Sequence, residues 1–191
     1  MKENTHDFLK AVQEELPEVT VLRREEERLI YAHGCYPREY KWLLQGPYKV
    51  LPEAILMPGS TDEVSRIMAL SQEYSVGVIP FGGGSGIVGG SIAENHEVML
   101  DIKNLKEFEI NPVNCTAVGG AGLTGADFEN MLNEAGYTCG QYPQSFQSAV
   151  LGGMVATRAI GTFSTKYGKM DDMVNSLEVV LPNGHVLNTH K

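Results

Sequence analysis

The chain has 191 residues, of which 42% are hydrophobic and 20% charged, and its formal net charge is −9 at pH 7. This composition predicts one large soluble domain or two small ones, and the acidic charge argues against nucleic acid or an anionic membrane as a partner. The polar N-terminus and the short apolar runs predict neither a signal peptide nor a membrane span. The three cysteines, Cys35, Cys115 and Cys139, form no metal-ligand pattern, so we expect a cytoplasmic location and no metal site.

The first fifty residues predict an N-terminal segment of helices and irregular chain. A short helix is expected at 7–15, where apolar residues share one side, and a second at 23–32, where charges are dense. Residues 34–52 are rich in aromatic residues and prolines, which predicts irregular chain that wraps the body of the domain.

A strand, a helix and a second strand are predicted next. The strand 54–57 is followed by a capping box at 60–63, which opens a helix over 61–74. A buried strand is expected at 76–79. This unit delivers the following loop at the carboxyl end of a strand, where α/β folds bind their ligands.

That loop, residues 80–91, contains six glycines and two serines. Residues without a Cβ let a ligand approach several amide N–H groups at once, as a phosphate requires. A Walker loop is excluded because the loop has no lysine. Gly84-x-Gly86-x-x-Gly89 matches the dinucleotide fingerprint, and Asp101 lies near the position expected for a ribose-binding acid. The dinucleotide-binding fold needs a helix after this fingerprint, however, and too few residues precede the next strand to form one. A glycine-rich turn without a ligand is the plain alternative.

The second half predicts further strands, one helix and a second segment of small residues. The expected strands lie at 98–102, 107–111 and 115–119, the helix at 124–136, the small-residue segment at 142–168, and a hairpin at 175–187 around Pro182-Asn183-Gly184. The two small-residue segments together could hold one extended dinucleotide better than either could alone.

Four stretches, 51–55, 80–91, 119–140 and 177–184, resemble in their order and spacing the FAD-binding domain of the vanillyl-alcohol oxidase and p-cresol methylhydroxylase superfamily. The strings at 122–125, 135–140 and 156–161 look most like alkylglycerone-phosphate synthases, with glycolate and D-lactate dehydrogenases as close relatives. The resemblance implies an α+β fold, the PCMH-type FAD-binding domain, in which two small α/β subdomains with mixed sheets hold FAD between them. It implies an N-terminal segment at 1–50 and the FAD-binding domain, C-terminally incomplete, at 51–191.

The resemblance also implies which residues contact the cofactor: the glycine loop would wrap the FAD pyrophosphate, and two parts of the second segment would line the flavin and its phosphates. These candidates are Pro80, Phe81, Gly82, Gly83, Gly84, Ser85, Gly86, Gln144, Ser145, Phe146, Gln147, Ser148, Ala149, Val150, Thr157, Arg158, Ala159 and Ile160.

Two of these candidates depart from the family pattern, and a third differs from one branch of it. Val150 and Ile160 stand where hydroxyl residues are usual, which removes a side-chain donor at each position. The dehydrogenases usually have Asn where this chain has Arg158, whose guanidinium suits a cofactor phosphate or a substrate carboxylate; a surface salt bridge is the alternative. No catalytic residue can be named from the sequence, because the histidines have no partner pattern.

The resemblance implies an FAD-dependent oxidoreductase that acts on a 2-hydroxy acid of the D-lactate or glycolate type. The alternatives are alkyl transfer onto dihydroxyacetone phosphate and a non-catalytic FAD-binding fragment. We expect non-covalent FAD, because Ser85 stands where an attached histidine would be and Cys139 lies too early for a second attachment. Since family members continue beyond the hairpin, we expect this chain to be inactive alone and to need a missing C-terminal substrate domain, with a homo-oligomer or partner subunit as possible assemblies.

Overall fold

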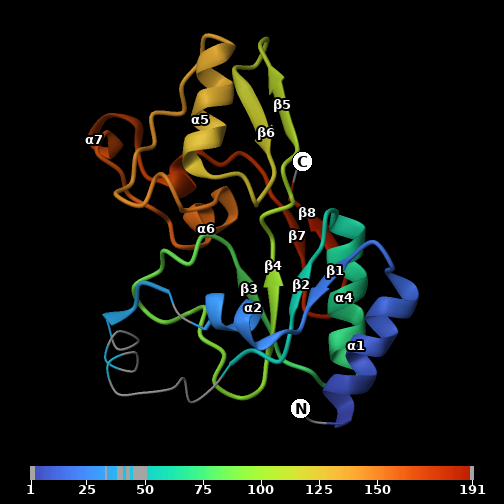
Figure 1. The fold of residues 1–191 in the computed structure, drawn as a ribbon. Coiled ribbons are helices and arrows are strands. Elements are labelled where there is room, and N and C mark those ends of the chain that lie inside the picture. Colours follow the sequence, from blue (N-terminus) through green and yellow to red (C-terminus); the bar gives the residue numbers. More distant parts are fainter. Residues whose placement is uncertain (1–2, 33, 38–40, 42–43, 45–50, 190–191) are drawn as a thin grey trace.

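The computed structural model describes residues 3–32, 34–37, 41, 44 and 51–189 (Figure 1). Its lower half in Figure 1 is built on a mixed four-stranded sheet in the order β1-β2-β4-β3. The strands are β1 (Thr20–Leu22), β2 (Ile55–Met57), β3 (Val78–Phe81) and β4 (Val98–Asp101). β1 runs antiparallel to β2, whereas β2, β4 and β3 are parallel.

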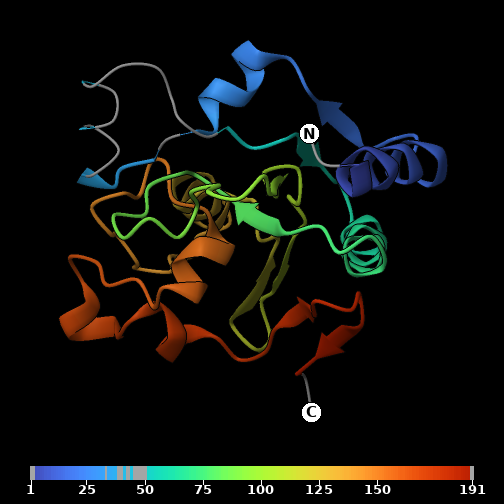
Figure 2. The ribbon, with the colours of Figure 1, turned by 90° about the horizontal axis from the view of Figure 1, so that it is seen from below.

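Two helices, α1 (Glu3–Glu15) and α4 (Thr61–Glu73), lie side by side against this sheet (Figures 1 and 2). α4 begins where predicted because the hydroxyl of Ser60 accepts a hydrogen bond from the amide of Glu63 at 3.2 Å. Apolar side chains of both helices are buried in one core with those of the sheet, including Phe8, Ile67 and Leu56, each 0% exposed. The first half is therefore held mainly by burial of apolar surface.

The strand before the glycine loop lies two residues later than the sequence predicts, at 78–81 instead of 76–79. It includes Pro80, which has no N–H to donate. β3 is an edge strand, so one of its sides has no ladder to complete and the proline is tolerated. The connection from β3 to β4, residues 82–97, contains no helix. The match of Gly84-x-Gly86-x-x-Gly89 to the dinucleotide fingerprint therefore does not form a Rossmann-type site, because that site requires a helix there.

The upper half of Figure 1 contains a β-hairpin and several helices around a second core. Its elements are β5 (Phe108–Asn111), β6 (Thr116–Gly119), α5 (Gly125–Glu134), α6 (Leu151–Ala156) and α7 (Ser164–Tyr167). α5 begins after Thr124, whose hydroxyl accepts a hydrogen bond from the amide of Asp127 at 3.0 Å. α6 and α7 lie inside the segment for which the sequence predicted only small residues.

The last hairpin, β7 (Glu178–Val180) and β8 (Val186–Asn188), returns to the first half and packs against α4. The hydroxyl of Ser65 on α4 donates to the carbonyl oxygen of Gly184 at 2.6 Å. Gly184 has a φ of +81°, and a Cβ there would lie 2.5 Å from the carbonyl oxygen of Ser65. Glycine in the predicted Pro-Asn-Gly turn is thus needed for the turn and for the contact with α4.

The N-terminal segment differs from its prediction. The expected helix at 23–32 is shorter, α2 (Glu25–Ile30), and it is preceded by β1, which the sequence did not predict. Much of the expected irregular stretch at 34–52 lies outside the described residues. Within the part of the chain that the structure describes, no helix is long and apolar enough to cross a membrane.

Candidate functional site

The glycine loop is defined from here on as residues 82–91, because residues 80 and 81 belong to β3. Its backbone lies in close contact with the second small-residue segment. A Cβ on Gly83 would lie 1.7 Å from the carbonyl oxygen of Ser148, and one on Gly82 would lie 2.3 Å from Cγ2 of Val150. Both distances are far below any real contact, so only glycine permits this approach. The fold therefore brings together the two segments that the sequence predicted to share one cofactor, near the end of β3 and beside α6 (Figures 1 and 2).

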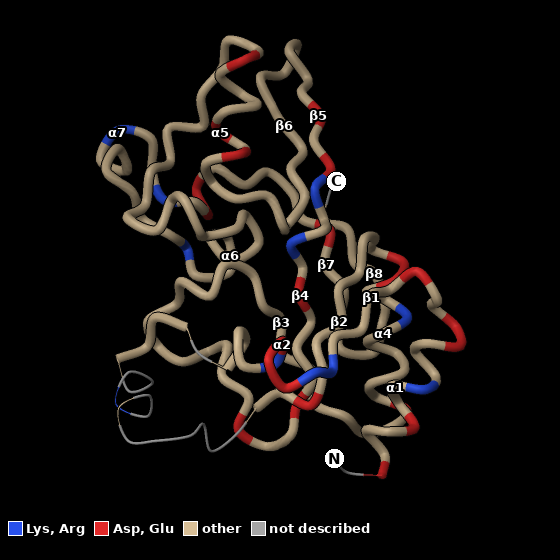
Figure 3. Tube along the Cα trace, in the orientation of Figure 1, with Lys and Arg blue, Asp and Glu red and all other residues tan. Residues whose placement is uncertain are grey.

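The backbone of the glycine loop has unused hydrogen-bond donors. The amide N–H groups of residues 82–88 donate to no other described residue. Cβ atoms added at Gly86 or Gly90 would meet no described atom within 4 Å, so the loop has open space beside it. No charged residue occurs from Val78 to Ala93 (Figure 3). Several free amides in an uncharged, glycine-rich loop fit a pyrophosphate, which backbone N–H groups can bind without lysines.

The second segment is fixed by backbone pairing to the chain around the start of α5. The amide of Gly125 donates to the carbonyl of Ala149 at 2.9 Å, and the amide of Leu151 donates to the carbonyl of Leu123 at 2.8 Å. Among the candidates, Ala149 and Val150 are buried and support the glycine loop, whereas Gln144, Gln147 and Ser148 are exposed, and Ser145 and Phe146 are half-buried.

The remaining candidates follow α6. The hydroxyl of Thr157 donates to the carbonyl of Gly153 at 2.8 Å, and the side chain of Ile160 is 68% exposed. Arg158 is exposed and has a φ of +51°, a left-handed conformation that favours Gly or Asn. It ends α6 in a Schellman-type turn, in which the amide of Ala159 donates to the carbonyl of Met154 at 2.8 Å.

An unpaired carboxylate oxygen lies in the turn that packs against α6. Oδ1 of Asp171 is buried and has no hydrogen-bond partner among the described residues, while Oδ2 lies 2.5 Å from Nζ of Lys169. The hydrogen bond from Lys169, aided by the charge of Arg158, lowers the pKa of Asp171. Asp171 is therefore an anion that offsets part of the positive charge next to the candidate residues.

Glu129 of α5 anchors the start of the second segment, a role that the sequence analysis missed. Its carboxylate is 3% exposed and accepts hydrogen bonds from the Tyr142 hydroxyl at 2.7 Å, the Cys139 amide at 3.0 Å and the Thr138 hydroxyl. The hydrogen bond to Glu129 raises the pKa of Tyr142, and burial, followed by the charge of Glu129, raises the pKa of the Cys139 thiol. The only indication in the sequence was that this carboxylate stands next to apolar residues that the helical pattern places on the inward side of α5.

Asp101 does not take the ribose-binding role considered above. It is 0% exposed and accepts a hydrogen bond from the hydroxyl of Tyr31 at 2.6 Å, and Nζ of Lys103 lies 3.0 Å from the same oxygen. Among the histidines, Nδ1 of His96 lies 2.5 Å from Oε1 of Glu53, whereas His33 and His190 lie outside the described residues. The described residues contain no group of three or more His, Cys, Asp or Glu side chains that could hold a metal ion.

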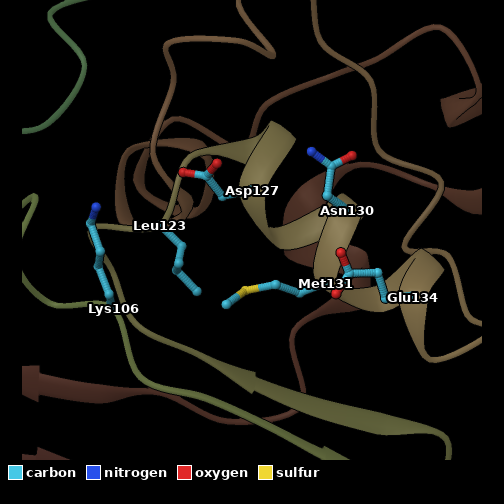
Figure 4. A pocket seen from close by; sticks show the side chains of 6 residues that line it. All are labelled: Lys106, Leu123, Asp127, Asn130, Met131 and Glu134. Atoms are coloured by element: carbon cyan, nitrogen blue, oxygen red, sulfur yellow. The ribbon is translucent and has the colours of Figure 1, made fainter.

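A separate hollow of about 340 Å³ lies beside α5 (Figure 4). It is lined by Lys106, Leu123, Asp127, Asn130, Met131 and Glu134. A larger hollow, of about 810 Å³, lies between the end of α4 and the β7–β8 turn. Neither includes a candidate cofactor residue, and the two carboxylates of the first would repel a pyrophosphate.

Comparisons with curated proteins give relatives of several activities. The chain is 32% identical over 165 residues to the alkyldihydroxyacetonephosphate synthase of Trypanosoma brucei brucei, 40% identical over 139 residues to an uncharacterized FAD-linked oxidoreductase of Escherichia coli K12, and 34% identical over 134 residues to the D-lactate dehydrogenase of Archaeoglobus fulgidus. These matches cover 83%, 71% and 70% of this chain but 27%, 28% and 30% of the relatives. The chain thus spans less than a third of each of these three proteins.

Solved structures share the fold. An alkyldihydroxyacetonephosphate synthase superposes with a TM-score of 0.88 at 31% identity, over 95% of this chain and 35% of the other. A berberine bridge enzyme variant superposes with a TM-score of 0.79 at 22% identity, over 96% of this chain and 37% of the other, a similarity of fold alone. The family model of the FAD binding domain matches residues 52–190, more than two thirds of the sequence. The chain therefore belongs to the FAD binding domain family, and its cofactor is FAD.

Proposed function

We propose that FAD lies between the glycine loop and the second segment, and that the protein containing this domain is an FAD-dependent oxidoreductase acting on a 2-hydroxy acid of the D-lactate or glycolate type. The observation that carries the placement is the run of amides at 82–88 that donate to no other described residue, in a loop that approaches the backbone of Ser148 and the side chain of Val150. The substrate class is supported by similarity to the D-lactate dehydrogenase of Archaeoglobus fulgidus and to the glycolate oxidase subunit GlcD of Bacillus subtilis.

The residues have distinct roles in this proposal. The amides of 82–86 bind the pyrophosphate, and the side chains of 144–150 and 157–160 border the flavin. FAD, when bound, would supply the two-electron acceptor for oxidation of the hydroxy acid to the 2-oxo acid, in which C2 loses a hydride and a base accepts the hydroxyl proton. The candidate residues include no Asp, Glu or His. In this proposal the base therefore lies outside the candidate residues, and a substrate-binding domain would supply it.

Exposed apolar side chains next to the site support the presence of a further domain or subunit that covers it. Ile87, Val88, Ile160 and Phe163 in the two segments are each at least half exposed, at 67%, 81%, 68% and 50%. A further segment of the same protein or a second subunit would bury these side chains and exclude water from the flavin. We place the protein in the cytoplasm, and the three free cysteines support a reducing compartment.

A second candidate function is alkyl transfer onto dihydroxyacetone phosphate. It is supported by the likeness to the alkyldihydroxyacetonephosphate synthase structure, which has a TM-score of 0.88. It is also supported by Arg158, which stands where the dehydrogenase relatives usually have Asn and whose charge suits a substrate phosphate.

Anaerobic mixing of the purified flavoprotein with D-lactate, glycolate or L-lactate tests the first proposal. Bleaching of the flavin by a 2-hydroxy acid is the expected result. If no hydroxy acid bleaches the flavin but labelled fatty alcohol is incorporated into an alkyl ether of dihydroxyacetone phosphate, the second candidate is correct. Bound flavin that neither substrate class perturbs would indicate a non-catalytic module.

A further inference from the structure

Tyr31 and Tyr36, which precede the region matched by the family model, contact the residue just before the glycine loop and the far part of the loop, respectively. At the start, the rings of Tyr31 and Phe81 meet edge to face with centroids 4.9 Å apart. At the far end, a Cβ on Gly89 would lie 3.2 Å from Cδ1 of Tyr36. The N-terminal segment therefore helps to define the position of the loop.

Tyr31 is itself held by a buried carboxylate. Its hydroxyl donates to Oδ2 of Asp101 at 2.6 Å, at the carboxyl end of β4. The amide of Lys103 donates to Oδ1 at 2.9 Å, and its ammonium group lies 3.0 Å from Oδ2. That ammonium also lies 5.2 Å from the ring centroid of Tyr31 and 5.5 Å from that of Phe81. A fully buried carboxylate requires such partners, so the position of the Tyr31 ring is closely fixed.

Phe81 transmits this position to the loop. It is the last residue of β3 and is 7% exposed. A Cβ on Gly84 would lie 2.9 Å from Cζ of Phe81, so the loop folds back over the phenylalanine ring. The contacts therefore run without a gap from Asp101 through Tyr31 and Phe81 to Gly84.

We propose that Tyr31 is a positioning residue for cofactor binding, which orders the glycine loop through Phe81 so that its free amides face the pyrophosphate. This inference rests on the proposed placement of FAD at the loop. A glycine-rich loop loses much backbone entropy on ordering, and this loop has few hydrogen bonds of its own. Because apparent affinity is reduced by the fraction of molecules in the binding-competent state, a less ordered loop binds FAD more weakly. Burial and Asp101 raise the pKa of Tyr31, so its hydroxyl stays a donor at physiological pH.

The test is the substitution Tyr31→Phe in the purified FAD-containing protein. It keeps the ring contact with Phe81 and removes only the hydroxyl. If the fraction of molecules with an ordered loop falls to about one fifth of its wild-type value, the apparent dissociation constant for FAD rises about fivefold. Thermolysin cleavage before the exposed residues Ile87 and Val88 of the apoprotein is expected to accelerate, because a larger fraction of the molecules has a disordered, cleavable loop.

Val12→Ala is the matched control, because it creates a cavity in the core of the same half at a side chain that is 0% exposed. It is expected to lower the melting temperature at least as much as Tyr31→Phe while leaving the FAD dissociation constant and the loop cleavage rate within about twofold of wild type. Asp101→Asn adds a double-mutant comparison: Tyr31→Phe is expected to have a smaller effect in that background, because the acceptor is already weakened.

The inference is overturned if Tyr31→Phe leaves both the FAD dissociation constant and the loop cleavage rate unchanged, or if Val12→Ala changes them equally. If Tyr31→Phe accelerates loop cleavage but Gly83→Ala does not weaken FAD binding, the proposed placement of FAD is wrong and the positioning of the loop by Tyr31 stands. The cleavage assay needs no cofactor, so it tests the contact in either case.

Discussion

Replacement of Gly83 by alanine should separate the two segments that form the candidate FAD site. The added methyl would lie 1.7 Å from the carbonyl oxygen of Ser148 and 2.6 Å from its carbonyl carbon. Ordinary contacts begin at 3.4 Å, so one backbone must move by about 1.7 Å. The obstructing atoms are backbone, which cannot rotate away as the end of a side chain can.

The expected loss of stability is large for a single methyl group. Overpacking of a well-packed site costs about 1–3 kcal/mol, and a clash with backbone lies at the upper end. About 3 kcal/mol corresponds to a fall in melting temperature of about 6–12 °C for a chain of this size. Since the same movement separates the glycine loop from Ser148, FAD binding should weaken by about tenfold or more.

The assay is thermal unfolding of the apoprotein together with FAD titration. Gly90→Ala is the matched control, because a Cβ at Gly90 meets no described atom within 4 Å and its backbone needs no positive φ. It should unfold within about 2 °C of wild type, since substitutions free of new contacts rarely change stability by more than about 0.5 kcal/mol. A Gly83→Ala protein that unfolds with the control and binds FAD as wild type does would refute the close approach of the two segments.

Three further predictions concern the cofactor and the charged groups. Acid denaturation followed by centrifugation should leave the flavin in the supernatant, because Ser85 provides no covalent attachment point; flavin fluorescence that migrates with the polypeptide on a denaturing gel would contradict this. Arg158→Asn should leave the melting temperature unchanged or raise it by about 1–2 °C, because Asn tolerates the positive φ better. The same substitution should raise the dissociation constant for FAD or the KM for substrate about tenfold. If neither value changes, Arg158 is a surface residue without a role in binding. Arg66 donates hydrogen bonds to Glu15 and lowers the pKa of that carboxyl group. The ion pair therefore stabilises the fold above the ordinary pKa of glutamate, and this stabilisation is lost as pH falls through the lowered pKa. The difference in melting temperature between wild type and Arg66→Ala should shrink in acid, and a difference that grows in acid would contradict the predicted direction.

The sequence by itself determined the elements that local chemistry fixes. The helix 61–74 and the helix after Thr124 were predictable because each starts with a hydroxyl cap and has an apolar side. The closing hairpin was predictable because Pro-Asn-Gly favours one tight turn. The glycine-rich strings alone predicted a dinucleotide-type ligand; FAD was implied by the resemblance of four stretches to a known FAD-binding domain, and the family match at 52–190 confirms it.

Tertiary structure decided what depends on contacts between distant residues. β1 forms only because β2 offers a partner. α6 forms in a glycine-rich segment whose own helix propensity is low, because backbone pairing to the chain before α5 and burial of Leu151 and Met154 stabilise it. The roles of the buried carboxylates were not predictable from the sequence: Asp101 is paired with Tyr31, 70 positions away, and Glu129 is paired with Thr138, Cys139 and Tyr142 only because the chain after α5 folds back onto that helix. A glycine pattern predicts that another group can closely approach the backbone, but it does not identify that group. Only the folded chain shows that Gly83 approaches Ser148 while the amides of 82–88 donate to no other described residue, because long-range packing decides which of these groups are covered.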